Sequence, residues 1–303
     1  MFDFRIFTFM EVCKTKNYTK AAEHLCITQP AVSKHIQYLE DYFKVQLFSY
    51  AGKKISITKE GYLLYKAANT MLCDEALLKQ QMLESNKQIK KLSFGVTLTI
   101  GEFVIGDCIR EYSQKHNTEN ISMQVNNTKE LLDKLESGEI EFAMIEGAIE
   151  RDKFECELFT TEEFIAVCAR NYSFKQKVSH IQDLIGEHMI IREPGSGSRE
   201  IFMQTLKERD IPLESFEKVT EMGSIHLLKE MVMEKEGITF LYKAAVKKEL
   251  MQKQLKIIPL KDFKLFHDFT FVWRKNSIFR EEYRQILKEF KEIYERSLVT
   301  EPL

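Results

Sequence analysis

The sequence predicts an α/β fold in three parts: a small helical head, one long uninterrupted helix, and a two-lobed body of strands and helices. Short amphipathic segments separated by turn residues occupy the first sixty positions. Residues 62–94 contain neither Gly nor Pro, which favours a single long helix. After residue 91, strand-like and helix-like segments alternate, a pattern typical of a parallel sheet covered by helices. With 303 residues, the chain is long enough for two or three domains.

Composition and charge narrow the class of protein. Hydrophobic residues make up 44% of the chain and charged residues 30%, as in a globular protein. No stretch approaches the ~18 uncharged apolar residues of a membrane helix, and the N-terminus lacks an export signal. We therefore expect a cytoplasmic protein without a membrane partner. Residues 1–66 carry ten Lys or Arg and six Asp or Glu, a net charge of +4, whereas the rest carries −6. This asymmetry favours a head that binds nucleic acid.

The six cysteines and seven histidines predict no metal site. Their spacing matches neither a Cys-x-x-Cys pair nor a zinc-binding pattern. We expect reduced thiols, with a redox-active pair of Cys156 and Cys168 as the alternative. The sequence offers no cluster of nucleophile, base and metal ligands, so neither a catalytic residue nor a cofactor is expected.

The head predicts a helix-turn-helix followed by a wing. We expect helices over 2–15 and 20–25, with Thr19 as the N-cap of the second. A tight turn follows at residues 26–27, and Thr28 caps a third helix with Pro30 in its first turn. Residues 47–57 are expected to form a hairpin, the wing, with a basic tip.

The third helix has an apolar face and a polar face. Val32, Ile36 and Leu39 repeat at three or four residues, whereas Gln29 and Ser33 lie on another side. Amide and hydroxyl groups can hydrogen-bond base edges, and an exposed proline can meet a thymine methyl. The expected DNA-binding residues are Thr28, Gln29, Pro30, Ser33, Lys34, Lys53 and Lys54. The alternative is an ordinary solvated helix face and, for the two wing lysines, a solvated basic turn.

Residues 59–90 are expected to form a linker and dimerisation helix. Leu64, Ala68, Met71, Leu78 and Met82 recur at helical spacing. A helix of about 30 residues would extend about 45 Å. Because such a stripe would be exposed in one chain, we expect it to pair with a second copy. A core helix within one domain is the alternative.

The body predicts alternating strands and helices. Expected strands cover residues 92–97, 121–125, 140–145, 163–168, 189–192, 216–220, 237–241 and 269–272. Expected helices cover residues 101–115, 129–136, 198–207, 225–234 and 280–297. This alternation indicates a parallel sheet, and about 210 residues suit two lobes better than one.

Several motifs together resemble the LysR-type transcriptional regulators. In the head they are Phe9-Met10-Glu11-Val12, Tyr18-Thr19-Lys20-Ala21-Ala22, Thr28-Gln29-Pro30-Ala31-Val32-Ser33-Lys34 and Ile57-Thr58-Lys59-Glu60-Gly61. In the body, segments 95–101, 141–147, 192–199 and 237–241 follow in the family's order. The wing departs from the pattern, because Tyr50 stands where the family usually places a basic residue.

The resemblance implies a domain organisation and a function. It implies a winged helix-turn-helix over 1–58, a linker helix over 59–90 and an effector domain over 91–303 that is similar to periplasmic binding proteins. Lobe 1 would cover about 91–162 and 267–303, and lobe 2 about 163–266. The expected function is sequence-specific regulation of transcription, with a double-stranded DNA operator, a homodimer or homotetramer, and a small anionic effector between the lobes.

Hydroxyl groups at strand-to-helix turns predict where the effector binds. Thr97 and Thr99 follow the first body strand, and helix N-termini favour anions. The glycine-rich segment 192–199 could form an anion nest to which Arg199 adds charge. The expected effector-binding residues are Thr97, Thr99, Thr128, Glu146, Glu193, Ser196, Ser198 and Ser224. The alternatives are plain helix capping for the threonines and a purely structural role for the loop.

Two other functions remain as alternatives for the α/β body. A solute-binding protein would need an export signal, and an enzyme would need a clustered set of reactive side chains. The sequence supplies neither, so the expected protein is a regulator without catalytic activity.

Overall fold

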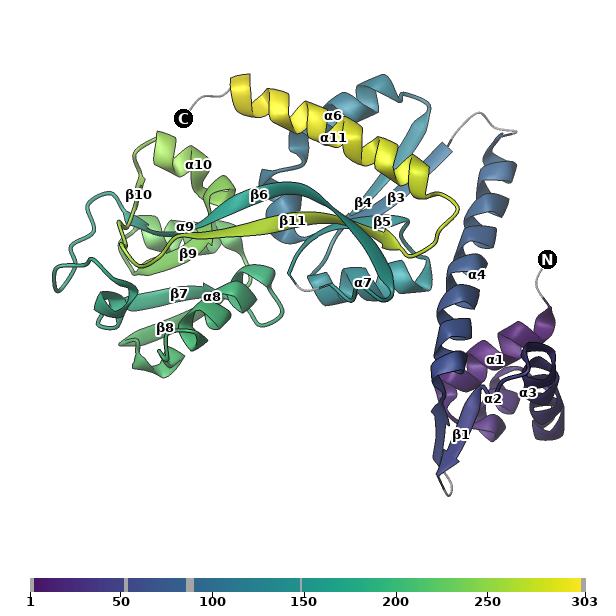
Figure 1. Cartoon of the computed structure of the whole chain (residues 1–303). Helices are drawn as coiled ribbons and strands as arrows, with labels where there is room; N and C mark the ends of the chain where they lie inside the picture. Colours follow the sequence, from purple (N-terminus) through teal and green to yellow (C-terminus); the bar gives the residue numbers. More distant parts are fainter. Residues whose placement is uncertain (1–2, 52–53, 86–89, 148, 301–303) are drawn as a thin grey trace.

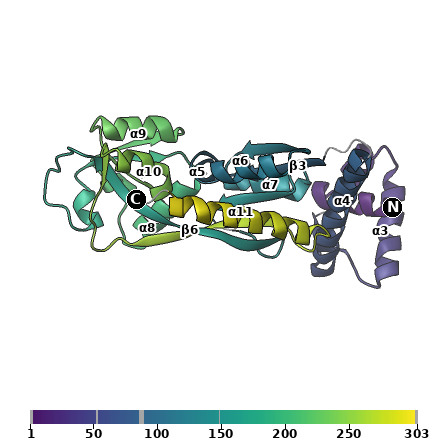
Figure 2. The same ribbon diagram turned by 90° about the horizontal axis from the view of Figure 1, so that it is seen from above.

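The computed structural model describes residues 3–51, 54–85, 90–147 and 149–300. Figure 1 shows a small head, a long helix beside it, and an elongated body on the other side of that helix. Seen from above in Figure 2, head, helix and body follow one another along one direction. The three expected parts are therefore present, in the expected order.

The head consists of helices α1 (Phe4–Thr15), α2 (Tyr18–His24) and α3 (Gln29–Phe43), followed by the hairpin β1 (Phe48–Ala51) and β2 (Lys54–Ile57). Its buried core includes Phe9, Val32, Ile36 and Leu47.

One capping prediction in the head is wrong. Asn17, not Thr19, caps α2, because the Asn17 side chain accepts hydrogen bonds from the backbone N–H groups of Thr19 and Lys20. Thr28 occupies the N-cap position of α3 but its side chain makes no capping hydrogen bond.

Helix α4 (Lys59–Ser85) has 27 residues and three different faces. One face packs on the head, where Ala68 is buried and Leu64 is partly buried. Another face remains apolar and exposed, with 54% of Met71 and 42% of Leu78 accessible. The single apolar stripe expected from the sequence is therefore divided between the head core and an open surface.

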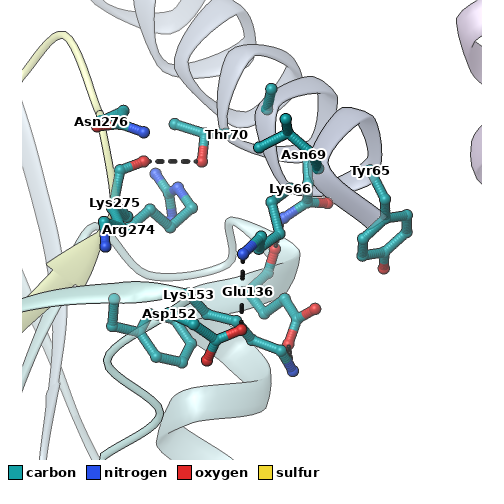
Figure 3. Close-up of a pocket in the computed structure, with 13 residues that line it drawn as sticks. Tyr65, Lys66, Asn69, Thr70, Glu136, Asp152, Lys153, Arg274, Lys275 and Asn276 are labelled. Atoms are coloured by element: carbon teal, nitrogen blue, oxygen red, sulfur yellow. Dashed lines mark hydrogen bonds and ion pairs between the residues drawn. The ribbon is translucent and has the colours of Figure 1, made fainter. Parts of the chain in front are cut away.

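The third face of α4 docks on the body, mostly through polar side chains (Figure 3), and Leu77 adds a buried apolar contact to the core of the body. Thr70 Oγ1 donates to the carbonyl of Lys275 at 3.1 Å, and Lys66 Nζ lies 3.6 Å from a carboxylate oxygen of Asp152. One turn further along, the buried Asp74 accepts hydrogen bonds from Ser277 Oγ at 2.9 Å and from the Ile278 N–H at 2.8 Å. A cavity of about 260 Å³ lies at this junction.

In the part of the chain that the structure describes, the body is built on a nine-stranded sheet of order β4-β3-β5-β11-β6-β9-β7-β8, with β10 paired to β6. The strands are β3 (Lys90–Val96), β4 (Glu119–Val125), β5 (Phe142–Glu146), β6 (Phe154–Ala169), β7 (His188–Arg192), β8 (Lys218–Met222), β9 (Ile238–Tyr242), β10 (Leu255–Ile257) and β11 (Leu265–Arg274). The helices are α5 (Leu98–Phe103), α6 (Gly106–Lys115), α7 (Thr128–Ser137), α8 (Gly197–Lys207), α9 (Ile225–Met233), α10 (Lys243–Met251) and α11 (Arg280–Thr300).

The expectation of a wholly parallel sheet is wrong at its centre. In lobe 1, β3 pairs in parallel with β4 and β5, and in lobe 2, β7 pairs in parallel with β8 and β9. Between them, β6 and β11 are antiparallel to each other and to their neighbours β9 and β5. The expected short strands 163–168 and 269–272 are parts of these longer strands, which run from one lobe into the other (Figure 1).

Other departures in the body are local. The helix expected over 101–115 is broken into α5 and α6 around Val104 and Ile105, and α10 and β10 were not expected. Helix α11 begins near α4, after the end of β11, and runs back along lobe 1 toward lobe 2, packing against α6 on the way. No helix within the described ranges is long and apolar enough to cross a membrane.

Candidate functional site

A cavity of about 200 Å³ lies where the carboxyl ends of strands from both lobes meet. Lobe 1 contributes Thr97, Leu98, Val125, Asn126, Asn127, Thr128 and Glu146, and lobe 2 contributes Arg192, Glu193, Ser196 and Gly197. In open α/β folds, ligands bind outside the carboxyl ends of the strands. The position and polar lining of this cavity make it the candidate effector site.

Thr97 follows β3 and occupies the N-cap position of α5, yet it does not act as a cap. Its side chain is 3% exposed and makes no capping hydrogen bond. Among the described residues, Thr97 Oγ1 has no hydrogen-bond partner. A buried hydroxyl without a partner is uncommon in folded proteins, and at a cavity wall it is available to a ligand.

Glu146 is the last residue of β5. Its side chain lies at the boundary between the lobes, next to Gly197 of lobe 2. Oε1 accepts a hydrogen bond from Thr99 Oγ1 at 3.3 Å, whereas Oε2 is buried and has no partner in the described part of the chain. A Cβ atom on Gly197 of α8 would lie 2.5 Å from Glu146 Cγ. Only glycine therefore allows lobe 2 to approach Glu146 this closely.

The buried position of Glu146 changes its acidity. Desolvation raises the pKa of Glu146 to about 7, while the hydrogen bond from Thr99 and the charge of Arg192 lower it in part. Near neutral pH this carboxyl group is therefore divided between its neutral and charged forms.

The glycine-rich loop places one arginine at the cavity and directs another away from it. Arg192 is buried and donates from Nε and Nη2 to the two carboxylate oxygens of Glu193, each at 2.8 Å. Arg199 instead pairs with Glu221 at 2.6 Å. Gly195 has a φ of +87°, which lets the chain turn into α8, and the side chain of Ser196 makes no capping hydrogen bond there.

The structure brings five of the eight expected effector-binding residues to the cavity wall: Thr97, Thr128, Glu146, Glu193 and Ser196. Thr99 lies behind Glu146, and Ser198 is buried next to Gly197. Ser224 is not brought to this cavity, because it caps α9, where its hydroxyl accepts from the Leu227 N–H at 3.3 Å.

The expected set misses three polar residues of the lining: Asn126, Asn127 and Arg192. Each lies at the end of a parallel strand or just after it. That position is the sequence signal that could have found them, since strand ends gather at one edge of a sheet.

The expected DNA-binding residues lie together at the start of α3, on the outside of the head. Thr28, Gln29, Pro30 and Lys34 are exposed, and Ser33 is partly exposed. Gln29 Nε2 donates to Ser33 Oγ at 2.9 Å, so the two side chains share one face. In the wing, Lys54 is exposed, and Lys53 lies outside the described residues.

The cysteines do not form the alternative redox pair. Cys156 and Cys168 both lie in the extended strand β6, and at ~3.3 Å per residue about 40 Å separate them, far beyond disulfide distance. Burial raises the pKa of Cys168 to about 11, which disfavours the reactive thiolate. No cluster of three or more His, Cys, Asp or Glu side chains suited to a metal ion occurs in the described ranges.

Comparison with known proteins identifies two matching domain families. The family described as "LysR substrate binding domain" matches residues 85–293, and the lysR family of bacterial regulatory helix-turn-helix proteins matches residues 5–62. Among curated relatives, the HTH-type transcriptional regulator CysL of Bacillus subtilis is 27% identical over 267 residues, covering 88% of each chain.

Solved structures show the same fold. A mutant of OxyR from Corynebacterium glutamicum, with bound H2O2, has a TM-score of 0.62 at 22% identity, over 97% of this chain and 93% of that one. Full-length LysG of the same organism, with bound effector Arg, has a TM-score of 0.64 at 14% identity, over 98% and 99%.

The buried carboxyl group of Glu146 predicts a pH-dependent stability. Because its folded-state pKa is about 7 and the ordinary value is 4.5, its neutral form stabilises the fold at low pH, and this contribution is lost as the pH rises from about 4.5 through 7. Glu146→Gln should therefore raise the free energy of unfolding at pH 8 by on the order of 3 kcal/mol, and by less than about 1 kcal/mol at pH 5.

Urea denaturation at the two pH values measures this difference. The exposed Glu200→Gln is the control and should show no comparable gain at pH 8. An equal gain for Glu146→Gln at both pH values would contradict the cost of a buried charge at this position.

Proposed function

The chain belongs to the family of LysR-type transcriptional regulators, and from this premise we propose that a small anionic effector binds between the lobes of its effector domain and controls its binding to a DNA operator. The observation that carries the effector proposal is the buried, partnerless hydroxyl of Thr97 at the cavity wall. The residues involved are those of the cavity described above and of the first turns of α3.

The proposed domain organisation assigns DNA binding to residues 1–58, linkage and dimerisation to 59–90, and effector binding to 91–303. Lobe 1 takes about 91–162 and 267–303, and lobe 2 about 163–266. These lobe boundaries fall inside β6 and β11, the two strands that pass between the lobes, so we propose that these strands form the hinge between them.

An anionic effector fits the donor groups at the cavity. Helix α8, which has eleven residues, begins at the cavity. The backbone N–H groups of its first turn and the helix dipole favour negative charge there. Arg192 adds a buried cation, although an effector would have to share it with Glu193. The volume of about 200 Å³ restricts the ligand to a small molecule.

Other functions are less well supported. The curated relative compared above is named as a transcriptional regulator, which argues against an enzyme or a solute-binding protein. Because the proposed partner is double-stranded DNA, we place the protein in the cytoplasm.

Dimerisation through α4 is proposed because Met71 and Leu78 expose apolar surface that a second copy would cover. Replacing both by Lys should reduce the mass of the full chain in analytical ultracentrifugation, because charged side chains would be buried in the contact. The wild type is expected to be a dimer, or a tetramer built from such dimers. Leu227→Lys on α9 serves as the exposed apolar control and should leave the mass unchanged.

Base readout is proposed for Gln29 and Ser33, whose mutual hydrogen bond would be exchanged for contacts to bases. Gln29→Ala and Ser33→Ala should each lower the discrimination between operator and unrelated DNA by ~1–3 kcal/mol. Fluorescence anisotropy with the DNA upstream of the protein's own gene measures both affinities. Gln204→Ala, which removes a similar exposed i,i+4 hydrogen bond on α8, should have no effect. If the α3 variants kept the wild-type ratio of affinity for the operator to affinity for unrelated DNA, base readout by this face of α3 would be rejected.

Effector binding by Thr97 is tested with Thr97→Val, which keeps the shape of the side chain and removes its hydroxyl. A thermal-shift screen of small carboxylates and of sulfur and phosphorus oxyanions identifies ligands, and calorimetry measures their affinity. Thr97→Val should weaken binding about tenfold, with DNA affinity in the absence of effector unchanged. Thr205→Val, at a buried threonine two turns along α8, is the control. Equal affinities for wild type and Thr97→Val would remove Thr97 from the site.

A further inference from the structure

We infer that the effector presents a hydrogen-bond donor, a hydroxyl or an ammonium group, to Glu146, so that the cavity selects small carboxylates that carry such a donor over those that carry none. This inference rests on the proposed role of the cavity between the lobes as the effector site. It adds the chemical class of the ligand and assigns the discrimination to one residue.

The geometry of Glu146 leaves one acceptor open. Its side chain is 2% exposed, and Thr99 behind it supplies a donor to Oε1 alone. Oε2 has no partner among the residues that the structure describes, and the residue lines the cavity. Buried carboxylate oxygens are normally hydrogen-bonded, so a donor on the ligand would complete the site.

The charges around Glu146 make a second acceptor unfavourable at this position. Arg192 on β7 favours the charged form of Glu146, but its guanidinium is already engaged by Glu193. Glu200 on α8 adds negative charge, and the buried Tyr242 of β9 lies within electrostatic reach. When Glu146 is charged, a ligand oxygen without a hydrogen would place two acceptors, and often two negative charges, next to each other.

The other groups at the cavity are hydrogen-bond donors, which is why the ligand should also carry a carboxylate. Thr97 offers an unpartnered hydroxyl, and the first turn of α8 offers backbone N–H groups. The cavity thus places donors and one open acceptor within a volume of about 200 Å³. A single small molecule with a carboxylate and a hydroxyl or ammonium group can meet both.

Matched sets of acids test the inference. L-lactate and L-alanine are compared with propionate, and L-malate and L-aspartate with succinate, on the full chain by ligand-observed NMR and calorimetry at pH 8, where Glu146 is mostly charged. The donor-bearing acids should bind the wild type roughly tenfold or more tightly than their counterparts without a donor. In Glu146→Gln this preference should disappear. The amide can accept from the hydroxyl or ammonium group of one acid and can equally donate to an oxygen of an acid without a donor.

Glu200→Gln is the matched control, since it removes a nearby negative charge outside the cavity wall. It should keep the preference of the wild type if Glu146 acts by direct contact. Equal binding within the sets, a preference that survives in Glu146→Gln, or its loss in Glu200→Gln would overturn the inference.

Failure of all these acids to bind at millimolar concentrations would also overturn it. The proposed effector site is tested separately, because the affinities of wild type and Thr97→Val for sulfur and phosphorus oxyanions do not depend on this inference.

Discussion

The antiparallel pairing of β6 with β11 holds the two lobes in one sheet, and both the cavity and the linker contact depend on it. Strand β6 pairs with β11 over most of its length and with β9 of lobe 2 at its far end. Strand β11 ends at Arg274, beside the loop that α4 contacts through Thr70 and Asp74. A change in the angle between the lobes would therefore act on strands whose ends touch the linker helix.

The contacts at the cavity and at the linker include buried polar groups beside the apolar core of the body, to which Leu77 of α4 belongs. At the cavity, Glu146 faces Gly197 across the lobe boundary, and at the linker the buried Asp74 is bound by Ser277 and Ile278. Effector binding can shift such an arrangement only by its difference in affinity for the two states, typically ~1–3 kcal/mol.

Helix α4 connects these parts because its faces serve different partners. Ala68 belongs to the core of the head, Asp74 contacts the body, and Met71 remains exposed. A rotation of this helix would move the head and the exposed apolar surface together, which would link the body to the spacing of the two heads in the proposed dimer.

The sequence by itself determined the features that depend on neighbouring residues. Helical periodicity predicted α3 and α4, and the position of Thr97, Thr128 and Glu146 at strand ends predicted their place at the cavity, because parallel strand ends meet at one edge. The tertiary structure alone decided the antiparallel β6 and β11, the division of the α4 stripe, the capping role of Ser224 and the open acceptor of Glu146. These features rest on contacts between residues far apart in the chain, such as Glu146 and Gly197, and local periodicity carries no information about such distances.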